Sequence, residues 1–250
     1  MSILSLTNVS KRFGNFTAVD NISFELEPYT INGFLGPNGA GKTTTIKMIC
    51  GILKPTSGSI ILNSIDVVRE PEKTRRSIGY MSQTFSLYSD LTVEENLRFF
   101  ASLYNLSGEE KSKRISELLE MFGLREYRDT LTAELPSGIR QRVSLSSAIL
   151  HTPSVLILDE PTSGVDPFFR IEFFKDIKEY ISQYKATVLL STHFMNEAEY
   201  CDRILLFNRG RIILNGNPDN LIQDFSQKLS DIKTNKRASL EEIFIRLTEE

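Results

Sequence analysis

The chain has 250 residues, of which 40% are hydrophobic, enough for one large α/β domain or two small ones. Its formal net charge of −3 argues against a general nucleic-acid-binding protein, which would carry a basic stripe, so no nucleic-acid partner is expected. Its two cysteines, Cys50 and Cys201, fit neither a metal-binding spacing nor a disulfide framework, and a reducing compartment is expected.

Membrane insertion is not indicated by the sequence. No apolar run approaches the roughly 18 residues of a membrane span, and the first residues lack the long apolar segment of a secretion signal. We therefore expect a soluble, cytoplasmic chain, for which any role at a membrane would require a partner.

Short strands are expected at the start of the chain. Residues 3–9 and 19–26 alternate or run apolar between turn residues, and residues 31–35 form a short apolar run. A helical stretch follows at residues 42–50. Further strands are expected at residues 59–62 and 78–82.

The stretch GPNGAGKTT, between the strand at 31–35 and the helix, fits the phosphate-loop pattern G-x-x-x-x-G-K-[ST]. Glycines let the backbone curl so that successive N–H groups point at one anion, and the phosphates then lie at a helix N-terminus. In this pattern Lys42 reaches the β- and γ-phosphates, and the Thr43 hydroxyl binds Mg²⁺. The alternative, a glycine-rich turn that binds nothing, is disfavoured by the strand–loop–helix context. The predicted phosphate-binding residues are Gly36, Pro37, Asn38, Gly39, Ala40, Gly41, Lys42, Thr43 and Thr44.

A helical insertion is expected next. Thr92 and Glu95 form the capping box T-x-x-E that starts a helix, and residues 109–122 carry apolar side chains at helical spacing. Residues from about 88 to 153 are therefore expected to be mainly helical.

Two buried parallel strands are expected after the insertion. The run at residues 155–158 is short and wholly apolar and ends at Asp159 and Glu160, and the run at 187–190 leads to His193. The remaining elements expected are a helix at 168–184, which makes a βαβ unit of the two strands, and two strands after Cys201 with a turn at Gly210.

Taken in this order, the motifs resemble the nucleotide-binding subunit of ATP-binding cassette (ABC) transporters, across nearly the whole chain. The resemblance implies an α/β fold, namely a P-loop NTPase core with an N-terminal antiparallel β subdomain and an inserted helical subdomain. It implies ATP and Mg²⁺ as cofactors. The implied organisation is one nucleotide-binding domain at 1–250, with its core at 1–87 and 154–215, the helical subdomain at 88–153 and a C-terminal extension at 216–250.

The resemblance also assigns roles to residues beyond the loop. Asp159 looks like a hard oxygen ligand of Mg²⁺, together with Thr43, and Glu160 looks like the general base that polarises the attacking water. Gln83 corresponds to the glutamine that reaches Mg²⁺ and the water and links the two lobes. His193 corresponds to the switch histidine that contacts the γ-phosphate. The alternative for Asp159 and Glu160 is a pair of solvent-facing carboxylates that cap the next helix.

Two further positions take their roles from the resemblance. Asp166, in SGVD, resembles the loop that makes contact across a dimer. Phe13, in KRFGNF, stands where the family has an aromatic side chain that stacks on adenine, and a π-face suits a purine. Phe16 is the alternative residue for this role, and both could instead be plain core residues.

The family's signature, L-S-G-G-Q or L-S-G-G-M followed by x-Q-R, is altered here to LPSGIRQR. Pro136 replaces the serine whose hydroxyl contacts the γ-phosphate bound by the opposite subunit, and proline has neither a hydroxyl nor an N–H. We expect the site to be kept in a modified form, with Ser137 acting from one position further on or capping the following helix. The residues that match the family are Leu135, Gly138, Gln141 and Arg142.

The stretches STHFMNEAEYCDRI and ASLEEIFIRL look like the bacterial export branch, especially multidrug-efflux ATPases that serve a separate permease. The resemblance implies an ATP-hydrolysing subunit that forms a homo- or heterodimer on ATP binding, at the cytoplasmic face of the membrane. Efflux of drugs or other small molecules is expected. A groove for a permease helix would include Phe85, Leu87 and Tyr88, so at least one of the three should be partly exposed.

Three other functions stay open. Pro136 could have abolished hydrolysis and left an ATP-gated regulatory clamp, although Glu160 and His193 speak against it. A soluble cassette ATPase of DNA repair or translation would carry a long coiled-coil insertion or two cassettes in one chain, and the sequence has neither. A nucleotide kinase would leave Gln83, the signature and SGVD unexplained.

Overall fold

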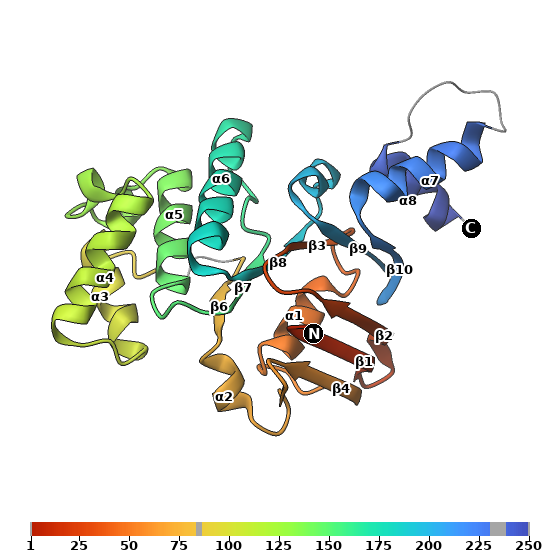
Figure 1. The fold of residues 1–250 in the computed structure, drawn as a ribbon, viewed down its shortest axis with the longest axis horizontal. Helices are drawn as coiled ribbons and strands as arrows, with labels where there is room; N and C mark the ends of the chain where they lie inside the picture. The colour runs from red at the N-terminus through yellow and green to blue at the C-terminus, as the bar shows by residue number, and fades with distance from the viewer. Residues whose placement is uncertain (1, 84–86, 231–238, 250) are drawn as a thin grey trace. The chain divides into compact units, whose positions relative to one another are not determined.

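The computed structural model describes residues 2–83, 87–230 and 239–249, and the chain divides into two compact units (Figure 1). Unit 1 comprises Met1–Thr74 and Val188–Glu250, and unit 2 comprises Arg75–Thr187. The predicted phosphate loop lies in unit 1, whereas the predicted carboxylates and the altered signature lie in unit 2.

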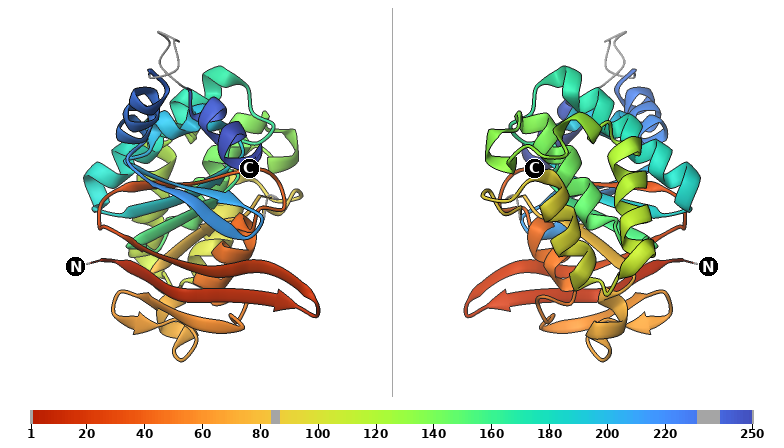
Figure 2. Two further views of the ribbon diagram at one scale, coloured as in Figure 1. Left: turned by 90° about the vertical axis from the view of Figure 1, so that its right-hand side faces the viewer. Right: turned by 90° about the vertical axis from the view of Figure 1, so that its left-hand side faces the viewer.

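Unit 1 contains a four-stranded antiparallel sheet with the strand order β2-β1-β4-β5. Strands β1 and β2 form a long hairpin, in which Phe13 pairs with Phe16 at the turn (Figure 2). Buried and exposed residues alternate from Ile22 to Leu26, because one face of this strand packs on the core. The strands are β1 (Leu4–Phe13), β2 (Phe16–Leu26), β4 (Ser57–Leu62) and β5 (Ile65–Asp66).

A second group of strands in unit 1 has β3 at its centre. Strand β3 pairs in parallel with both β8 and β9, and β10 turns back antiparallel to β9. Every residue of β3 is buried, as expected for a parallel strand covered on both faces. The strands are β3 (Ile31–Leu35), β8 (Thr187–Thr192), which belongs to unit 1 from Val188 on, β9 (Arg203–Asn208) and β10 (Arg211–Gly216).

Helices in unit 1 lie after the phosphate loop and at the end of the chain. Helix α1 (Lys42–Ile49) follows the loop directly. The C-terminal extension forms α7 (Pro218–Ser230) and α8 (Leu240–Glu249). Helix α8 contacts α7 and the short helix η3 (Met195–Tyr200), with Leu240 and Ile243 buried.

Unit 2 combines a pair of parallel strands with longer helices. Strand β6 (Ile78–Met81) pairs in parallel with β7 (Val155–Asp159). The predicted helical insertion contains α3, α4 and α5, and α6 follows β7. The helices are α3 (Val93–Leu103), α4 (Gly108–Met121), α5 (Ser137–Ala148) and α6 (Pro167–Tyr184), with the short helices η1 (Arg125–Tyr127) and η2 (Thr132–Glu134), and α2 (Pro71–Arg75) spans the sequence boundary between the units.

The predicted capping box at the start of α3 is confirmed. The Thr92 hydroxyl accepts a hydrogen bond from the Glu95 N–H at 3.2 Å, and the Glu95 carboxylate accepts one from the Thr92 N–H at 2.9 Å. Two backbone donors that a helix start leaves unpaired are thereby satisfied.

An ion pair between the half-buried Arg142 and the buried Asp176 joins α5 to α6. The Arg142 guanidinium donates to both carboxylate oxygens of Asp176, at 2.7 and 3.4 Å. Burial raises the pKa of Asp176 to about 6, although the nearby Arg142 acts in the opposite direction. Glu172 and Glu179 add smaller effects that also raise this pKa.

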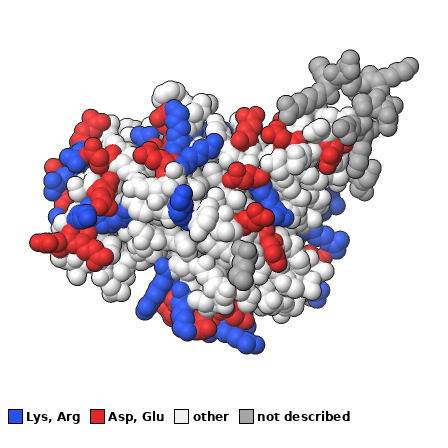
Figure 3. Space-filling view, in the orientation of Figure 1, with Lys and Arg blue, Asp and Glu red and all other residues white. Residues whose placement is uncertain are grey.

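The surface carries charges of both signs. On the face drawn in Figure 3, lysine and arginine side chains are interspersed with aspartate and glutamate, an arrangement typical of solvated surfaces. Within the described ranges, no helix combines the length and the apolarity needed to cross a membrane.

Replacing Thr92 by alanine should lower the free energy of unfolding by about 1 kcal/mol, because the hydroxyl that caps α3 is lost. Glu95→Gln is the matched control, since a glutamine amide can also complete a capping box, and its effect should be smaller. Denaturant titration followed by circular dichroism measures both. Equal losses in the two variants would contradict the reciprocal bonding.

The stability of the protein should depend on the ionisation of Asp176. Because its pKa is raised from 3.8 to about 6 in the folded state, the folded chain binds this proton where the unfolded chain has released it. Its contribution to stability is present below about pH 4 and is lost as the pH rises through about 6. Carbon-13 NMR should place the carboxyl midpoint near 6, and Asp176→Asn should remove a fall in stability of about 1 to 3 kcal/mol over that range. A midpoint near 4 would contradict this.

Candidate functional site

The phosphate loop connects β3 to α1 and makes two close approaches to neighbouring backbone. Gly36 has φ 141° and Gly41 has φ 108°, in the region that favours glycine. A Cβ atom on Gly36 would lie 2.3 Å from the Phe207 carbonyl oxygen, and one on Gly41 would lie 2.8 Å from the Ala18 carbonyl oxygen. These positions therefore require glycine for both conformation and space.

Hydrogen bonds fix the middle of the loop from the turn between β9 and β10. The Gly210 N–H donates to the Ala40 carbonyl at 2.9 Å, and the Asp20 N–H donates to the Gly210 carbonyl at 2.8 Å. Within the loop, the Ala40 N–H donates to the Pro37 carbonyl at 3.2 Å. These backbone hydrogen bonds fix the conformation of the loop without a ligand, as a preorganised anion site requires.

Lys42 is folded against this loop. Its side chain is buried, and Nζ donates to the carbonyl oxygens of Gly36 at 2.6 Å and Pro37 at 3.1 Å. Helix α1 begins at Lys42 and has no acidic residue in its first turn, so no side-chain carboxylate there offsets the positive end of the helix dipole. Thr43 and Thr44 are half-buried at the same helix start. The arrangement suits a polyphosphate.

Aromatic rings stand at the tip of the β1–β2 hairpin. Phe13 is 50% exposed and Phe16 is 64% exposed, so the alternative that both are core residues is wrong. The Lys11 ammonium lies 5.0 Å from the centre of the Phe13 ring. An exposed π-face beside a cation can take a flat, electron-rich ring.

His193 directly follows β8 in unit 1. Its ring lies against that of Phe194, with the ring centres 4.1 Å apart, and the residue is half-buried. The Phe194 N–H donates to the Thr192 hydroxyl at 3.0 Å, which fixes the turn at the end of the strand.

The two predicted carboxylates end strand β7 in unit 2. Asp159 is 1% exposed and Glu160 is 8% exposed, so they are not the solvent-facing caps that the sequence left open. Glu160 has φ 51°, which is uncommon for a residue other than glycine and is concentrated at functional positions. The Gln83 amide donates to the Glu160 carboxylate at 3.1 Å, so the structure brings these two predicted residues together.

The helix that follows the altered signature, α5, begins differently from the expectation that Ser137 could cap it. Pro136 occupies the N-cap position of α5, with φ −54° and ψ 149°, and Ser137 is already the first residue of the helix. The helix has no side-chain cap hydrogen bond, so the prediction that Ser137 caps it is wrong. The fixed φ of proline fits the residue just before the helix, and this places the Ser137 side chain one position too late to cap. Leu135 and Gly138 are buried, whereas Ser137 is exposed.

Asp166 has a local structural role that the sequence reasoning missed. Its carboxylate caps α6, accepting hydrogen bonds from the N–H groups of Phe168 at 3.0 Å and Phe169 at 3.1 Å. The dipeptide Asp166-Pro167 is a helix-start signal that would have predicted this cap.

The prediction of an exposed apolar residue near Gln83 is confirmed by Tyr88, which is 46% exposed. Leu87 is half-buried, and Phe85 lies outside the described residues. The Tyr88 ring packs edge-on against Phe99 at 4.7 Å, and the Tyr88 N–H donates to the buried Asn96 side chain at 2.8 Å. An apolar surface supported by α3 is therefore available for a partner.

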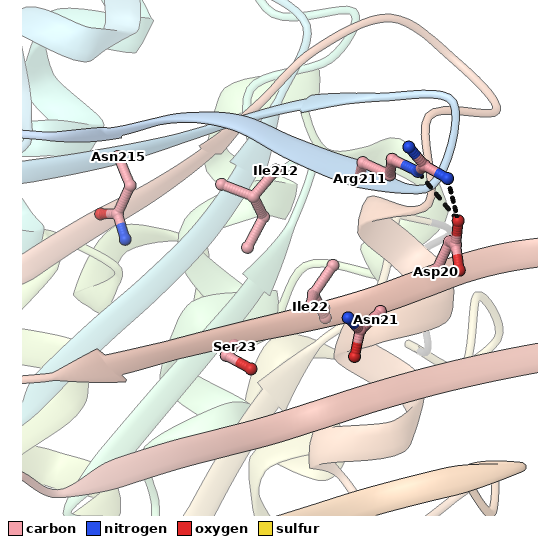
Figure 4. A pocket seen from close by; sticks show the side chains of 7 residues that line it. All are labelled: Asp20, Asn21, Ile22, Ser23, Arg211, Ile212 and Asn215. Atoms are coloured by element: carbon pink, nitrogen blue, oxygen red, sulfur yellow. Dashed lines mark hydrogen bonds and ion pairs between the residues drawn. The ribbon is translucent and has the colours of Figure 1, made fainter.

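A cavity of about 620 Å³ lies between β2 and β10 in unit 1 (Figure 4). Its two charged side chains, Asp20 and Arg211, bind each other at 2.6 and 2.8 Å. None of the predicted site residues lines it, and the mutual pairing leaves no surplus charge for a phosphate. Its lining residues are Asp20, Asn21, Ile22, Ser23, Arg211, Ile212 and Asn215.

Comparison with known proteins agrees with this geometry. The ABC transporter family matches residues 19–163. The probable multidrug ABC transporter ATP-binding protein YbhF of Escherichia coli K12 is 47% identical over 88% of this chain, which spans 38% of that relative's length. The Nod factor export ATP-binding protein I of Cupriavidus metallidurans is 38% identical over 88% of this chain and 73% of its own length.

One further relative and two solved structures are similar. The linearmycin resistance ATP-binding protein LnrL of Bacillus subtilis is 37% identical over 88% of this chain and 70% of its own length. A structure of the ATP-binding subunit of an ABC transporter superposes with a TM-score of 0.84, at 32% identity over 99% of this chain and 100% of the other. The dimeric ATP-binding cassette MJ0796, bound to ADP and Pi, superposes with a TM-score of 0.77 at 28% identity. The match covers 86% of this chain and 98% of that cassette.

The family match covers more than half of this chain, and two relatives more than 30% identical are matched over more than two thirds of their lengths. The chain belongs to the ABC transporter family.

Proposed function

We propose that this chain is an ATP-hydrolysing subunit that dimerises on ATP binding and powers a membrane exporter formed with a separate permease. The observation that carries the proposal is the phosphate loop, with Lys42 buried against it at the start of α1. This arrangement presents backbone N–H groups, a helix N-terminus and one ammonium group to a single anion.

The nucleotide would be held by the loop and the hairpin tip of unit 1. Residues 36–44 would bind the phosphates, with Lys42 on the β- and γ-phosphates. Phe13 would stack on adenine, and its exposed ring supports that role, with Phe16 as the alternative. His193, at the end of β8, would contact the γ-phosphate.

The chain offers oxygen donors that fit Mg²⁺. Thr43 supplies a hydroxyl, Asp159 a buried carboxylate and Gln83 an amide oxygen, all hard ligands. In the described part of the chain, no three His, Cys, Asp or Glu side chains form a complete metal site, and Mg²⁺ commonly takes its other ligands from phosphates and water. When bound, Mg²⁺ neutralises charge on the phosphates.

Hydrolysis would depend on Glu160. Its carboxylate would accept a proton from the attacking water and orient that water, while the Gln83 amide holds the carboxylate in place. Burial of Glu160 keeps bulk water away from the carboxylate, which strengthens its interaction with a bound water. Most of the remaining rate enhancement in phosphoryl transfer comes from positioning and charge stabilisation.

Export and assembly follow from the relatives. The names of three similar proteins refer to multidrug transport, Nod factor export and linearmycin resistance, which supports efflux of drugs or other small molecules. A dimeric cassette among the similar structures supports a homo- or heterodimer. In that dimer, the signature residues Leu135, Pro136, Ser137 and Gly138 would face the partner's ATP, and the loop residue Asp166 would make contact across the dimer. The permease would dock near Tyr88, and the subunit would act at the cytoplasmic face of the membrane.

A second candidate is an ATP-gated clamp with impaired hydrolysis. Pro136 at the N-cap of α5 removes the hydroxyl that the family places there, and this observation favours the clamp. The clamp would still dimerise on ATP, because closure needs contacts to the bound nucleotide and does not need its cleavage.

Glu160→Gln should lower ATP turnover by the purified chain about 100- to 10,000-fold, because the general base is lost while size and hydrogen bonding are kept. Glu179→Gln, on the exposed side of α6, is the matched control and should retain turnover. The rate of phosphate release from ATP in the presence of Mg²⁺ is measured for the wild type and both variants. If the wild type releases phosphate no faster than Glu160→Gln, Glu160 has no part in the chemistry. If that wild-type protein still forms dimers on ATP binding, the clamp is favoured.

Ser137→Ala should lower turnover about tenfold if its hydroxyl replaces the family's serine at the partner's phosphate. Pro136→Ser, which restores the family residue, should match or exceed the wild type. Ser112→Ala, on the exposed side of α4, is the control. Unchanged turnover in both Ser137→Ala and Pro136→Ser would show that the altered signature has no local compensation.

A further inference from the structure

In the first turn of α5, Gly138 lies directly against the aromatic ring of Phe169 from α6. A Cβ atom on Gly138 would lie 2.3 Å from the Cδ1 and Cε1 atoms of Phe169 and 2.4 Å from its Cγ. Gly138 is buried in an α-helix, where alanine is normally the better residue. The glycine at this position is therefore explained by the ring of Phe169 rather than by the backbone of α5.

The Phe169 ring also lies close to a second residue of α5. The Arg142 guanidinium, one turn further along α5, lies 5.2 Å from the centre of the ring. Arg142 is itself fixed by two hydrogen bonds to Asp176 on α6, at 2.7 and 3.4 Å. Because the half-buried Arg142 is held by charge-assisted hydrogen bonds to Asp176, it opposes movement of the ring away from Gly138.

The backbone of Phe169 is tied to the loop before α6. Its N–H donates to the Asp166 carboxylate at 3.1 Å, and so does the N–H of Phe168 at 3.0 Å. The two neighbouring phenylalanines differ, because Phe168 is 72% exposed, whereas Phe169 is partly buried against α5.

We propose that Phe169 is a positioning residue that joins the signature segment at 135–138 to the Asp166 loop, so that the two segments move as one body. The proposal rests on the function proposed above, in which the signature faces the partner's ATP and the Asp166 loop makes contact across the dimer. A shift of Asp166 would then be transmitted through the Phe169 backbone and ring to Gly138. The altered signature would keep its position in this way, although it lacks a side-chain helix cap.

A double-mutant cycle between Gly138 and Phe169 tests the contact. In the wild type, Gly138→Ala should lower the melting temperature, and turnover should fall about tenfold or more, because a displacement near 1 Å is enough for such losses. In the Phe169→Ala background, the same change should raise the melting temperature, because alanine is the better helix former and the ring is gone. An equal effect of Gly138→Ala in both backgrounds would overturn the proposal.

Turnover in the single variant separates positioning from packing. Phe169→Ala should lower turnover about tenfold or more and leave the affinity of the isolated subunit for a fluorescent Mg–ATP analogue unchanged. Phe168→Ala is the matched control and should behave like the wild type. Phe173→Leu, which alters a buried phenylalanine of the same helix, provides a destabilised protein for comparison. If Phe173→Leu and Phe169→Ala are destabilised equally and lose the same turnover, Phe169 contributes only packing, and the positioning role is wrong.

Glu160→Gln is measured in the same series. If it has the same turnover as the wild type, the proposed function fails. If turnover depends on Glu160, but Phe169→Ala and Phe168→Ala have equal rates, the proposed function stands and the positioning role fails.

Discussion

The close passage of the phosphate loop beside two backbone segments is the constraint on which the candidate nucleotide site depends. At Gly36 the Phe207 carbonyl occupies the space of a side chain, and at Gly41 the Ala18 carbonyl does so. The turn at Gly210 then bonds to the loop through Ala40. Because strands from both sheets of unit 1 form these walls, the loop's N–H groups are directed before any ligand arrives. A preformed site avoids the entropic cost of ordering the loop around the phosphates.

The residues proposed for catalysis, which lie in unit 2, are held in a different way. Strand β7 is buried throughout, so the backbone is rigid up to the point where Asp159 and Glu160 begin. The left-handed conformation of Glu160 costs free energy, and it persists because the surrounding structure holds it. The Gln83 amide bonds to the same side chain, so the carboxylate has a defined orientation. Strand β7 fixes the backbone position of the two carboxylates. The positive φ of Glu160 and the bond from Gln83 fix the direction of the Glu160 side chain.

Residues at strand ends could be predicted from the sequence, because an apolar run that stops at Asp159 or leads to His193 marks where a buried strand meets polar chemistry. The capping box at Thr92 could be predicted for the same reason, since the signal is local. Glu160's conformation could not, because a positive φ at glutamate is imposed by tertiary structure. The possible cap by Ser137 was wrong because Pro136, with its fixed φ, occupies the N-cap position of α5. The exposure of Phe13 was open because an aromatic residue in a hairpin can face either side.

The contact between Gly138 and Phe169 shows how a departure from a family pattern can be tolerated. A glycine in a helix is normally a loss, and a proline at the N-cap contributes no hydrogen bond. Here the missing side chain of Gly138 makes room for the Phe169 ring, which lies against Arg142, itself bound to Asp176. The Phe169 N–H donates to the Asp166 carboxylate. The first turn of α5, which has no side-chain cap, is thereby supported by packing against α6 and by the ion pair between Arg142 and Asp176. Pro136 contributes its fixed backbone angle to this helix start.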